Sequence, residues 1–231
     1  MEKCRVKVWD VPTRLFHWLL VLLTVGALIT GFLGGGLIEF HGQLGLAIAG
    51  LLVFRLAWGV VGSTYARFTQ FVPGPARVFA YLRGQWHGLG HNPLGAFSVL
   101  GLLALMLFQA GSGLVADDDI SFAGPLRALA SQSTADCFTK LHKLNVWLIL
   151  GLVSLHILSV IFYAVVKKNN LLFPMFTGYK TVDDPTLEPA RGGGWLSFIL
   201  AVLIAVAAVW IANGGLNPPP PPPPPQTAPA W

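Results

Sequence analysis

Residues 140–157 read KLHKLNVWLILGLVSLHI, and the apolar run that begins within them continues without a charged residue from Leu144 to Val166. About 20 residues of helix cross the ~30 Å hydrocarbon core of a bilayer. This run is long enough, and it is apolar on every side rather than along one stripe, so it predicts a membrane-spanning helix. His142 and His156 are fourteen residues apart, which on a helix is about 21 Å along the axis and nearly the same face. One helix thus presents two imidazoles at different depths.

Four more runs, uncharged or nearly so, have the length of a membrane span. The chain of 231 residues has 54% hydrophobic and only 11% charged side chains, whereas a soluble domain averages about 25% charged. This balance excludes an ordinary soluble enzyme and a disordered chain. The predicted fold is an all-α integral membrane bundle, with a four-helix core within residues 1–180 and a fifth membrane helix. The predicted spans are residues 18–38, 42–62, 94–116, 144–166 and 195–212.

A proline-rich tail, residues 213–231, follows the fifth predicted span and contains eight consecutive prolines, Pro218–Pro225. Such a run forms a stiff polyproline II rod. The simplest interpretation is a spacer, and the alternative is a docking strut for a partner on the outer side of the membrane.

Positive residues beside the spans predict the orientation of the chain. With a cytoplasmic N-terminus, eleven Lys and Arg residues lie inside, three lie outside, and Arg55 lies within a span. After five spans the C-terminus is then outside, and Asp117–Asp119 lie in an outer loop. The net charge of +5 therefore reflects topology among membrane lipids and does not indicate a nucleic-acid partner. The eleven inner residues are Lys3, Arg5, Lys7, Arg14, Arg67, Arg77, Arg83, Lys167, Lys168, Lys180 and Arg191, and the three outer ones are Arg127, Lys140 and Lys143.

Four histidines form two pairs that are matched in depth. His17 begins the first span on the inner side, at the depth of His156, and His41 begins the second span on the outer side, at the depth of His142. We call His17 and His156 the inner pair, and His41 and His142 the outer pair. Neutral imidazole is a common iron ligand, and helix bundles bind cofactors between facing helices. The pairing predicts two haem groups, each held non-covalently by two histidines.

Other roles for these histidines are less favoured by the pattern. A single histidine at a membrane edge is often only interfacial, but two matched pairs rarely arise by chance. A proton relay more often includes buried Asp or Glu, and the predicted spans contain none. Zinc prefers a compact tetrahedral cluster, not residues about 21 Å apart.

Three basic residues are candidates to bind haem propionates. Arg55 follows His41 by fourteen residues and lies at inner depth, where no protein carboxylate is expected and where a buried guanidinium needs an anion. The alternative is that Arg55 extends to the inner interface. Lys140 and Lys143 flank His142 and are candidates for an outer propionate, or simply solvated interface charges.

The two remaining histidines, His87 and His91, lie in the segment RGQWHGLGHNP, residues 83–93. Its glycines and proline predict a loop. His91 is therefore interpreted as a loop residue or as a cap of the third span.

Several motifs in order resemble the bacterial cytochrome b561 family, which includes the b-type cytochrome subunits of nickel-iron hydrogenases. The resemblance covers roughly residues 5–180 and implies haem b bound by His17, His41, His142 and His156. It implies electron transfer between a partner redox protein and membrane quinone in the bacterial inner membrane. The motifs are VWDVPTRLFHW (8–18), HGQLGLAIAGLLVFRLAWGVVGSTYARFTQFVPGP (41–75), GHNPLGAFSVLGLLAL (90–105), GSGLVADDDISFAGPL (111–126) and KLHKLNVWLILGLVSLHI (140–157).

The sequence departs from hydrogenase-associated members in the short stretch between the first two spans, residues 34–40. This departure argues against a hydrogenase partner, and the fifth span and tail lie beyond the resemblance. The favoured function is a di-haem electron conduit between quinone and an extracytoplasmic c-type cytochrome or dehydrogenase subunit. A stand-alone quinone reductase that uses a diffusible outer reductant such as superoxide is the alternative, and a transporter or assembly scaffold without haem is a third hypothesis.

Overall fold

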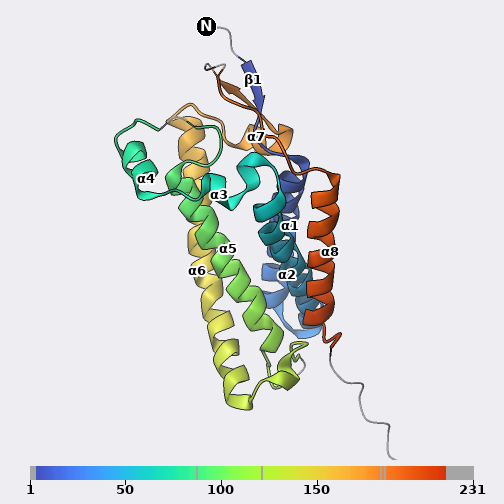
Figure 1. Cartoon of the computed structure of the whole chain (residues 1–231). Helices are drawn as coiled ribbons and strands as arrows, with labels where there is room; N and C mark the ends of the chain where they lie inside the picture. The colour runs from blue at the N-terminus through green and yellow to red at the C-terminus, as the bar shows by residue number, and fades with distance from the viewer. Residues whose placement is uncertain (1–3, 87, 121, 183, 185, 217–231) are drawn as a thin grey trace, which may run out of the picture.

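The computed structural model describes residues 4–86, 88–120, 122–182, 184 and 186–216. Five of the helices in this part of the chain are long and apolar enough to cross a membrane (Figure 1). The predicted all-α membrane bundle is confirmed. Residues 217–231, which include the proline run, and His87 lie outside the described residues. The five helices are α1 (Val11–Leu33), α2 (Ile38–Val61), α5 (Pro93–Val115), α6 (Gln132–Val165) and α8 (Trp195–Ala212).

Side-chain caps begin three of these helices. The Asp10 carboxylate accepts a hydrogen bond of 2.7 Å from the Thr13 N–H, so α1 begins seven residues before the predicted span. Asn92 caps α5 in the same way through the Gly95 N–H, and Ser131 caps α6 through the Thr134 N–H. Each cap satisfies a backbone donor that a helix start leaves free. Helix α6 begins twelve residues before its predicted span because three polar turns precede the apolar run.

Most of the short elements gather at one end of the bundle, which we call the sheet end. Strands β1 (Cys4–Lys7) and β2 (Tyr179–Val182) pair there as an antiparallel sheet, with Cys4 opposite Val182 and Lys7 opposite Tyr179. Figure 1 shows that this sheet lies beyond the start of α1, whereas the connections between α1 and α2 and between α5 and α6 lie at the opposite end. The remaining short helices are η1 (Gly35–Leu37), η2 (Thr64–Ala66), α3 (Phe68–Phe71), α4 (Pro75–Leu82), η3 (Arg127–Leu129) and α7 (Leu172–Thr177).

Helix α2 is the central element of the bundle because it packs against α1, α5 and α8. Its residues Leu52 and Trp58 are fully buried, and α8 buries Ala201 and Ala205 in the same core. Helix α6 packs against α5 and leaves most of its large apolar side chains exposed, as a surface in contact with lipid does. The fifth helix therefore belongs to the packed bundle.

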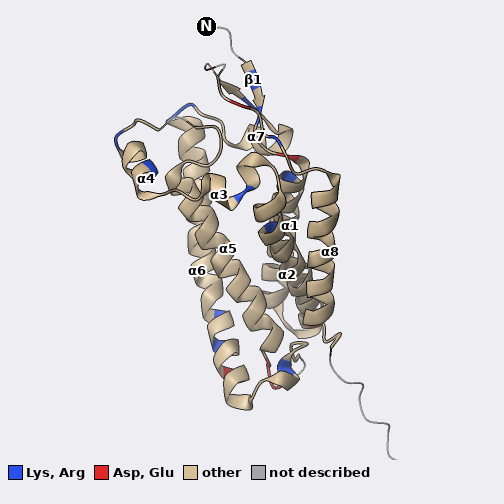
Figure 2. Cartoon of the chain, viewed as in Figure 1, with Lys and Arg blue, Asp and Glu red and all other residues tan. Residues whose placement is uncertain are grey.

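Charged side chains are concentrated at the two ends of the bundle (Figure 2). The described Lys and Arg residues among 5–14, 67–83 and 167–191 belong to β1, to the first turn of α1, or to the loops and short elements of the sheet end. Arg127, Lys140 and Lys143 lie toward the opposite end, in η3 and the first turns of α6.

Candidate functional site

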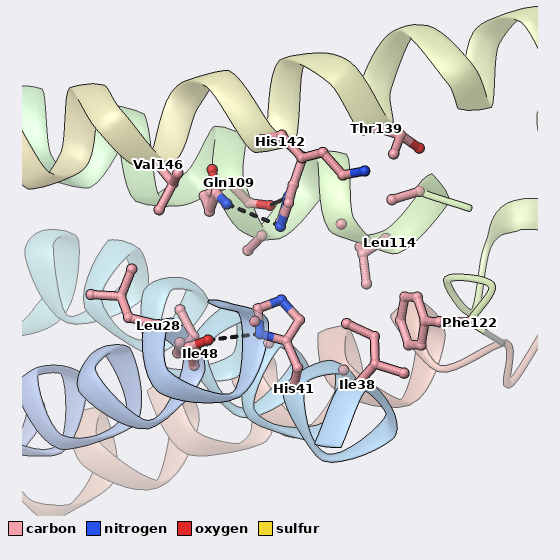
Figure 3. A pocket seen from close by; sticks show the side chains of 18 of the residues that line it. Leu28, Ile38, His41, Ile48, Gln109, Leu114, Phe122, Thr139, His142 and Val146 are labelled. Atoms are coloured by element: carbon pink, nitrogen blue, oxygen red, sulfur yellow. Dashed lines mark hydrogen bonds between the residues drawn. The ribbon is translucent and has the colours of Figure 1, made fainter. Parts of the chain in front are cut away.

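The outer pair faces one cavity at the end opposite the sheet (Figure 3). His41 comes from the first turn of α2 and His142 from α6, and their ring centroids are 6.1 Å apart with the ring planes nearly perpendicular. The cavity has a volume of about 450 Å³ and is lined by residues of α1, α2, α5 and α6. Most of its lining is aliphatic or aromatic, including Leu28, Ile48 and Leu114.

Backbone carbonyls orient both outer imidazoles. The Nδ1 atom of His41 lies 2.8 Å from the Ala27 carbonyl oxygen on α1, and Nδ1 of His142 lies 3.0 Å from the Gln109 carbonyl oxygen on α5. A carbonyl can only accept a hydrogen bond, so each Nδ1 is the protonated nitrogen and each Nε2 retains its lone pair. Metal-binding histidines are held by this kind of hydrogen bond. The outer pair therefore fits a site in which His41 and His142 would hold a haem iron through Nε2.

Glycines provide the space that these rings occupy. A Cβ atom on Gly31 would lie 2.8 Å from Cε1 of His41, and one on Gly113 would lie 3.1 Å from Cε1 of His142. Gly45, one turn beyond His41, lines the cavity with no atom within 4 Å of its Cβ position. Space for a flat macrocycle beside the two imidazoles is thus present, as haem requires.

Polar side chains within the spans contact His142, and sequence analysis missed them. Gln109 Nε2 lies 3.0 Å from His142 Nε2, and the buried Asn145 donates to Gln109 Oε1 at 2.8 Å. Ser112 Oγ lies 3.1 Å from His142 Nδ1. Since iron and an amide donor would compete for one lone pair, the Gln109 side chain would have to turn away for His142 to bind iron. In the sequence, these three residues could have been recognised as candidates because they are polar residues within otherwise apolar runs.

The inner pair lies in the half of the bundle nearer the sheet. His17, on α1, and His156, on α6, are close enough to interact electrostatically. The ring of His17 packs edge-on against Trp18 at 4.9 Å, and its Nδ1 atom is buried without a hydrogen-bond partner among the described residues. The structure thus brings the rings of the outer pair together, with carbonyl partners on Nδ1, and places the inner pair within electrostatic range.

Arg55 is buried near the sheet-end terminus of α2, with 3% of its surface exposed. Its guanidinium lies 4.9 Å from the ring centre of Phe68 and 5.7 Å from that of Phe71 on α3. Such contacts favour a cation over an aromatic face. Its Nη1 atom has no hydrogen-bond partner in the described part of the chain.

The expectation that no protein carboxylate approaches Arg55 is wrong. Asp10, the cap of α1, is buried and interacts electrostatically with Arg55. Its oxygens accept hydrogen bonds from the Thr13 N–H at 2.7 Å and from the Trp58 indole N–H at 3.0 Å. The described residues show no ion pair between Asp10 and Arg55, so the guanidinium still lacks a directly bound anion.

The two lysines beside His142 differ in position. Lys143 lines the outer cavity, whereas Lys140 is exposed and is absent from the cavity lining among the described residues. Asp117 and Asp118 line the same cavity, and Asp117 forms an ion pair with Arg127 at 2.7 Å. Hydrogen bonds from the Asp119 N–H and from Arg127 lower the pKa of Asp117. The mouth of the cavity therefore carries both signs of charge.

Residues 8–178 match the family described as "Prokaryotic cytochrome b561". The chain belongs to the prokaryotic cytochrome b561 family. This cytochrome is similar to the probable Ni/Fe-hydrogenase B-type cytochrome subunits of Azotobacter vinelandii, with 27% identity over 79% of the chain and 91% of the relative, and of Rhizobium leguminosarum bv. viciae, with 24% identity over 80% and 92%. It is also similar to the probable Ni/Fe-hydrogenase 1 B-type cytochrome subunit of Escherichia coli (strain K12), with 22% identity over 75% and 90%. No solved structure matches the chain.

The resemblance inferred from the motifs is thereby confirmed. The protein is a multi-pass membrane cytochrome of b type, which implies haem b and a part in electron transport. The short stretch at residues 34–40 gave reason to doubt a hydrogenase partner, but the chain is nevertheless similar to proteins that are named as hydrogenase subunits.

Proposed function

We propose that this cytochrome b561 carries electrons across the bacterial inner membrane through two haem b groups. His41 and His142 would hold one group, and His17 and His156 the other. The observation that carries the proposal is the pair of Nδ1–carbonyl hydrogen bonds at 2.8 and 3.0 Å, which direct Nε2 of His41 and His142 toward one cavity. Such second-shell bonds orient histidines for metal binding.

Haem b supplies a one-electron couple when bound. Two imidazole ligands on each iron leave no open position for substrate, which favours outer-sphere electron transfer. The protein binds and orients the groups through the four histidines and excludes water with the apolar lining of the outer cavity. Arg55 would neutralise a propionate of the inner group, and Lys140 or Lys143 would do so for the outer group.

The sheet end would face the cytoplasm, because most of the described Lys and Arg residues lie there. The N-terminus is then cytoplasmic and the C-terminus periplasmic. The outer cavity faces a periplasmic electron-transfer partner, and quinone in the membrane exchanges electrons with the haem chain.

We propose a dehydrogenase subunit as that partner, and specifically a Ni/Fe hydrogenase, since the relatives are named as its cytochrome subunits. A periplasmic c-type cytochrome is the second candidate. A diffusible anion such as superoxide is disfavoured, because Asp117 and Asp118 line the outer cavity together with Lys143.

The test is haem content of protein purified in detergent. A reduced-minus-oxidised spectrum should show a b-type band, and the wild-type chain should bind two haems. His41→Ala and His17→Ala should each lose one haem and retain the other, because each substitution removes an axial ligand of one pair. Two haems retained in both variants would show that the ligand assignment is wrong.

A further inference from the structure

Buried polar atoms without partners are concentrated in the half of the bundle nearer the sheet. In the described residues, all eight such side-chain atoms belong to the start of α1, the end of α2 and the segment after it, or the region around the start of α5. A buried donor without a partner destabilises the fold, so such a cluster indicates a polar ligand. The residues are Thr13, Arg14, His17, Arg55, Ser63, Arg67, His91 and Ser98.

His91 is the histidine of this cluster that the electron-transfer proposal does not use. It precedes the cap of α5, and its ring lies between Trp9, at 4.8 Å, and Phe71, at 5.1 Å between ring centroids. The side chain is partly exposed toward a second cavity of about 370 Å³, but its Nδ1 atom is buried and has no described partner. Two aromatic rings therefore hold the imidazole in place while one nitrogen remains unsatisfied.

The same aromatic cluster connects His91 to Arg55. Phe71 contacts the His91 ring and also lies 5.7 Å from the Arg55 guanidinium carbon. His91 interacts electrostatically with Arg55, His17 and His156. Burial, together with the positive charge of Arg55, lowers the pKa of His91 to about 3. His91 is then neutral at pH 7, with one N–H to donate and no charge of its own to neutralise.

A neutral donor and an unpaired guanidinium beside the inner pair fit one kind of ligand. A carboxylate accepts several hydrogen bonds and supplies the negative charge that Arg55 lacks. Asp10 does not supply that contact, because its oxygens accept from Thr13 and Trp58 and form no ion pair with Arg55 among the described residues. Haem b carries two carboxylates as its propionates, and the inner haem would be adjacent.

We propose that His91 is a cofactor-binding residue, which donates a hydrogen bond from Nδ1 to a propionate of the inner haem that Arg55 also binds. This inference rests on the proposed function, since it requires a haem on His17 and His156. It assigns a role to a residue that sequence analysis interpreted as part of a loop or as a cap.

The test compares two substitutions at one position in the full-length protein. His91→Leu removes the donor, whereas His91→Asn keeps an N–H donor near the position of Nδ1. We expect His91→Leu to lower the midpoint potential of the inner haem, because a less neutralised propionate favours ferric iron, and His91→Asn to restore it toward the wild-type value. The inner haem is identified as the one that His17→Ala loses, and the outer haem reports folding in the same sample.

Gln85→Leu is the matched control, because Gln85 lines the same second cavity as His91 and has no assigned contact with the cofactor. It should leave both potentials unchanged. If His91→Leu does not accumulate, His91→Gln replaces it, since this moves the donor to the position of Nε2 and should also lower the inner potential.

The proposal is overturned if His91→Leu retains two haems at wild-type potentials, or if His91→Asn and His91→Leu shift the inner potential equally. The latter result would show that the ring acts only by packing. A failure of the proposed function is distinguishable, because wild-type protein would then lack haem, or His17→Ala would retain as many haems as the wild type.

Discussion

Each outer histidine forms a hydrogen bond to a backbone carbonyl of another helix. This bond distinguishes it from a polar residue that lies in a membrane helix without a role. His41 donates to Ala27 on a neighbouring helix, and His142 donates to Gln109 on another. The residue types and their spacing were predictable from the sequence. The identity of each acceptor was not, because it depends on the rotation and depth of one helix relative to the next.

The Gly31 position provides a residue-scale prediction. In Gly31→Ala the new Cβ would lie 2.8 Å from Cε1 of His41, so the imidazole must move and its bond to the Ala27 carbonyl must weaken. We expect the haem content of purified protein to fall from two toward one per chain, measured as the pyridine haemochromogen. Gly151→Ala, on α6 with no atom within 4 Å of its Cβ position, should retain two. Full haem content in Gly31→Ala would contradict the proposed position of the outer haem.

Helices α6 and α8 show what sequence patterns reveal at the scale of elements. Both were predicted from their apolar runs, but helix α6 begins twelve residues before its predicted span, in turns that are rich in polar residues. The packing of α8 was not predictable. It fits against α2 through small residues, with Gly50 so close to Val209 that a Cβ on this glycine would lie 2.7 Å from Val209 Cγ2. Small residues let membrane helices approach closely.

The interface between α2 and α8 can be tested with a matched pair of substitutions on α8. Ala201 is 0% exposed in the core, and Val206 is 61% exposed. Ala201→Leu inserts methylene groups into a packed interface, which typically costs about 1–3 kcal/mol. We expect a lower apparent Tm for detergent-solubilised Ala201→Leu and an unchanged one for Val206→Leu. Equal melting of both variants would show that α8 is not a packed part of the bundle.

At the scale of the molecule, the sheet end joins distant parts of the chain. Strand β1 pairs with a strand more than 170 residues later, and the Trp58 indole donates to the Asp10 carboxylate. These contacts place Arg55 beside Phe68, Phe71 and His91. The end of the helix on which Arg55 lies was predictable from the sequence, but its electrostatic interactions with Asp10 and His91 were not, because only the fold brings these residues near one another.

The two cysteines test the proposed orientation of the whole molecule. Cys4 lies in β1 at the sheet end, and Cys137 is exposed on the first turns of α6 at the opposite end. In intact spheroplasts a membrane-impermeant maleimide should label Cys4→Ser, which retains Cys137. It should label Cys137→Ser only after lysis, because Cys4 would face the cytoplasm. The reverse pattern would invert the proposed topology.

The sequence by itself determined that this is a membrane protein, how many long helices it has, and that its histidines lie at two depths. Lipid requires apolar side chains around a whole helix, and the helical repeat places residues fourteen apart on nearly one face. Only the tertiary structure decided which helix faces meet, which carbonyls hold His41 and His142, and that Phe71 contacts both His91 and Arg55. The physical reason is that side chains facing lipid are as apolar as those in the core, so no polar stripe marks the contact face of a membrane helix.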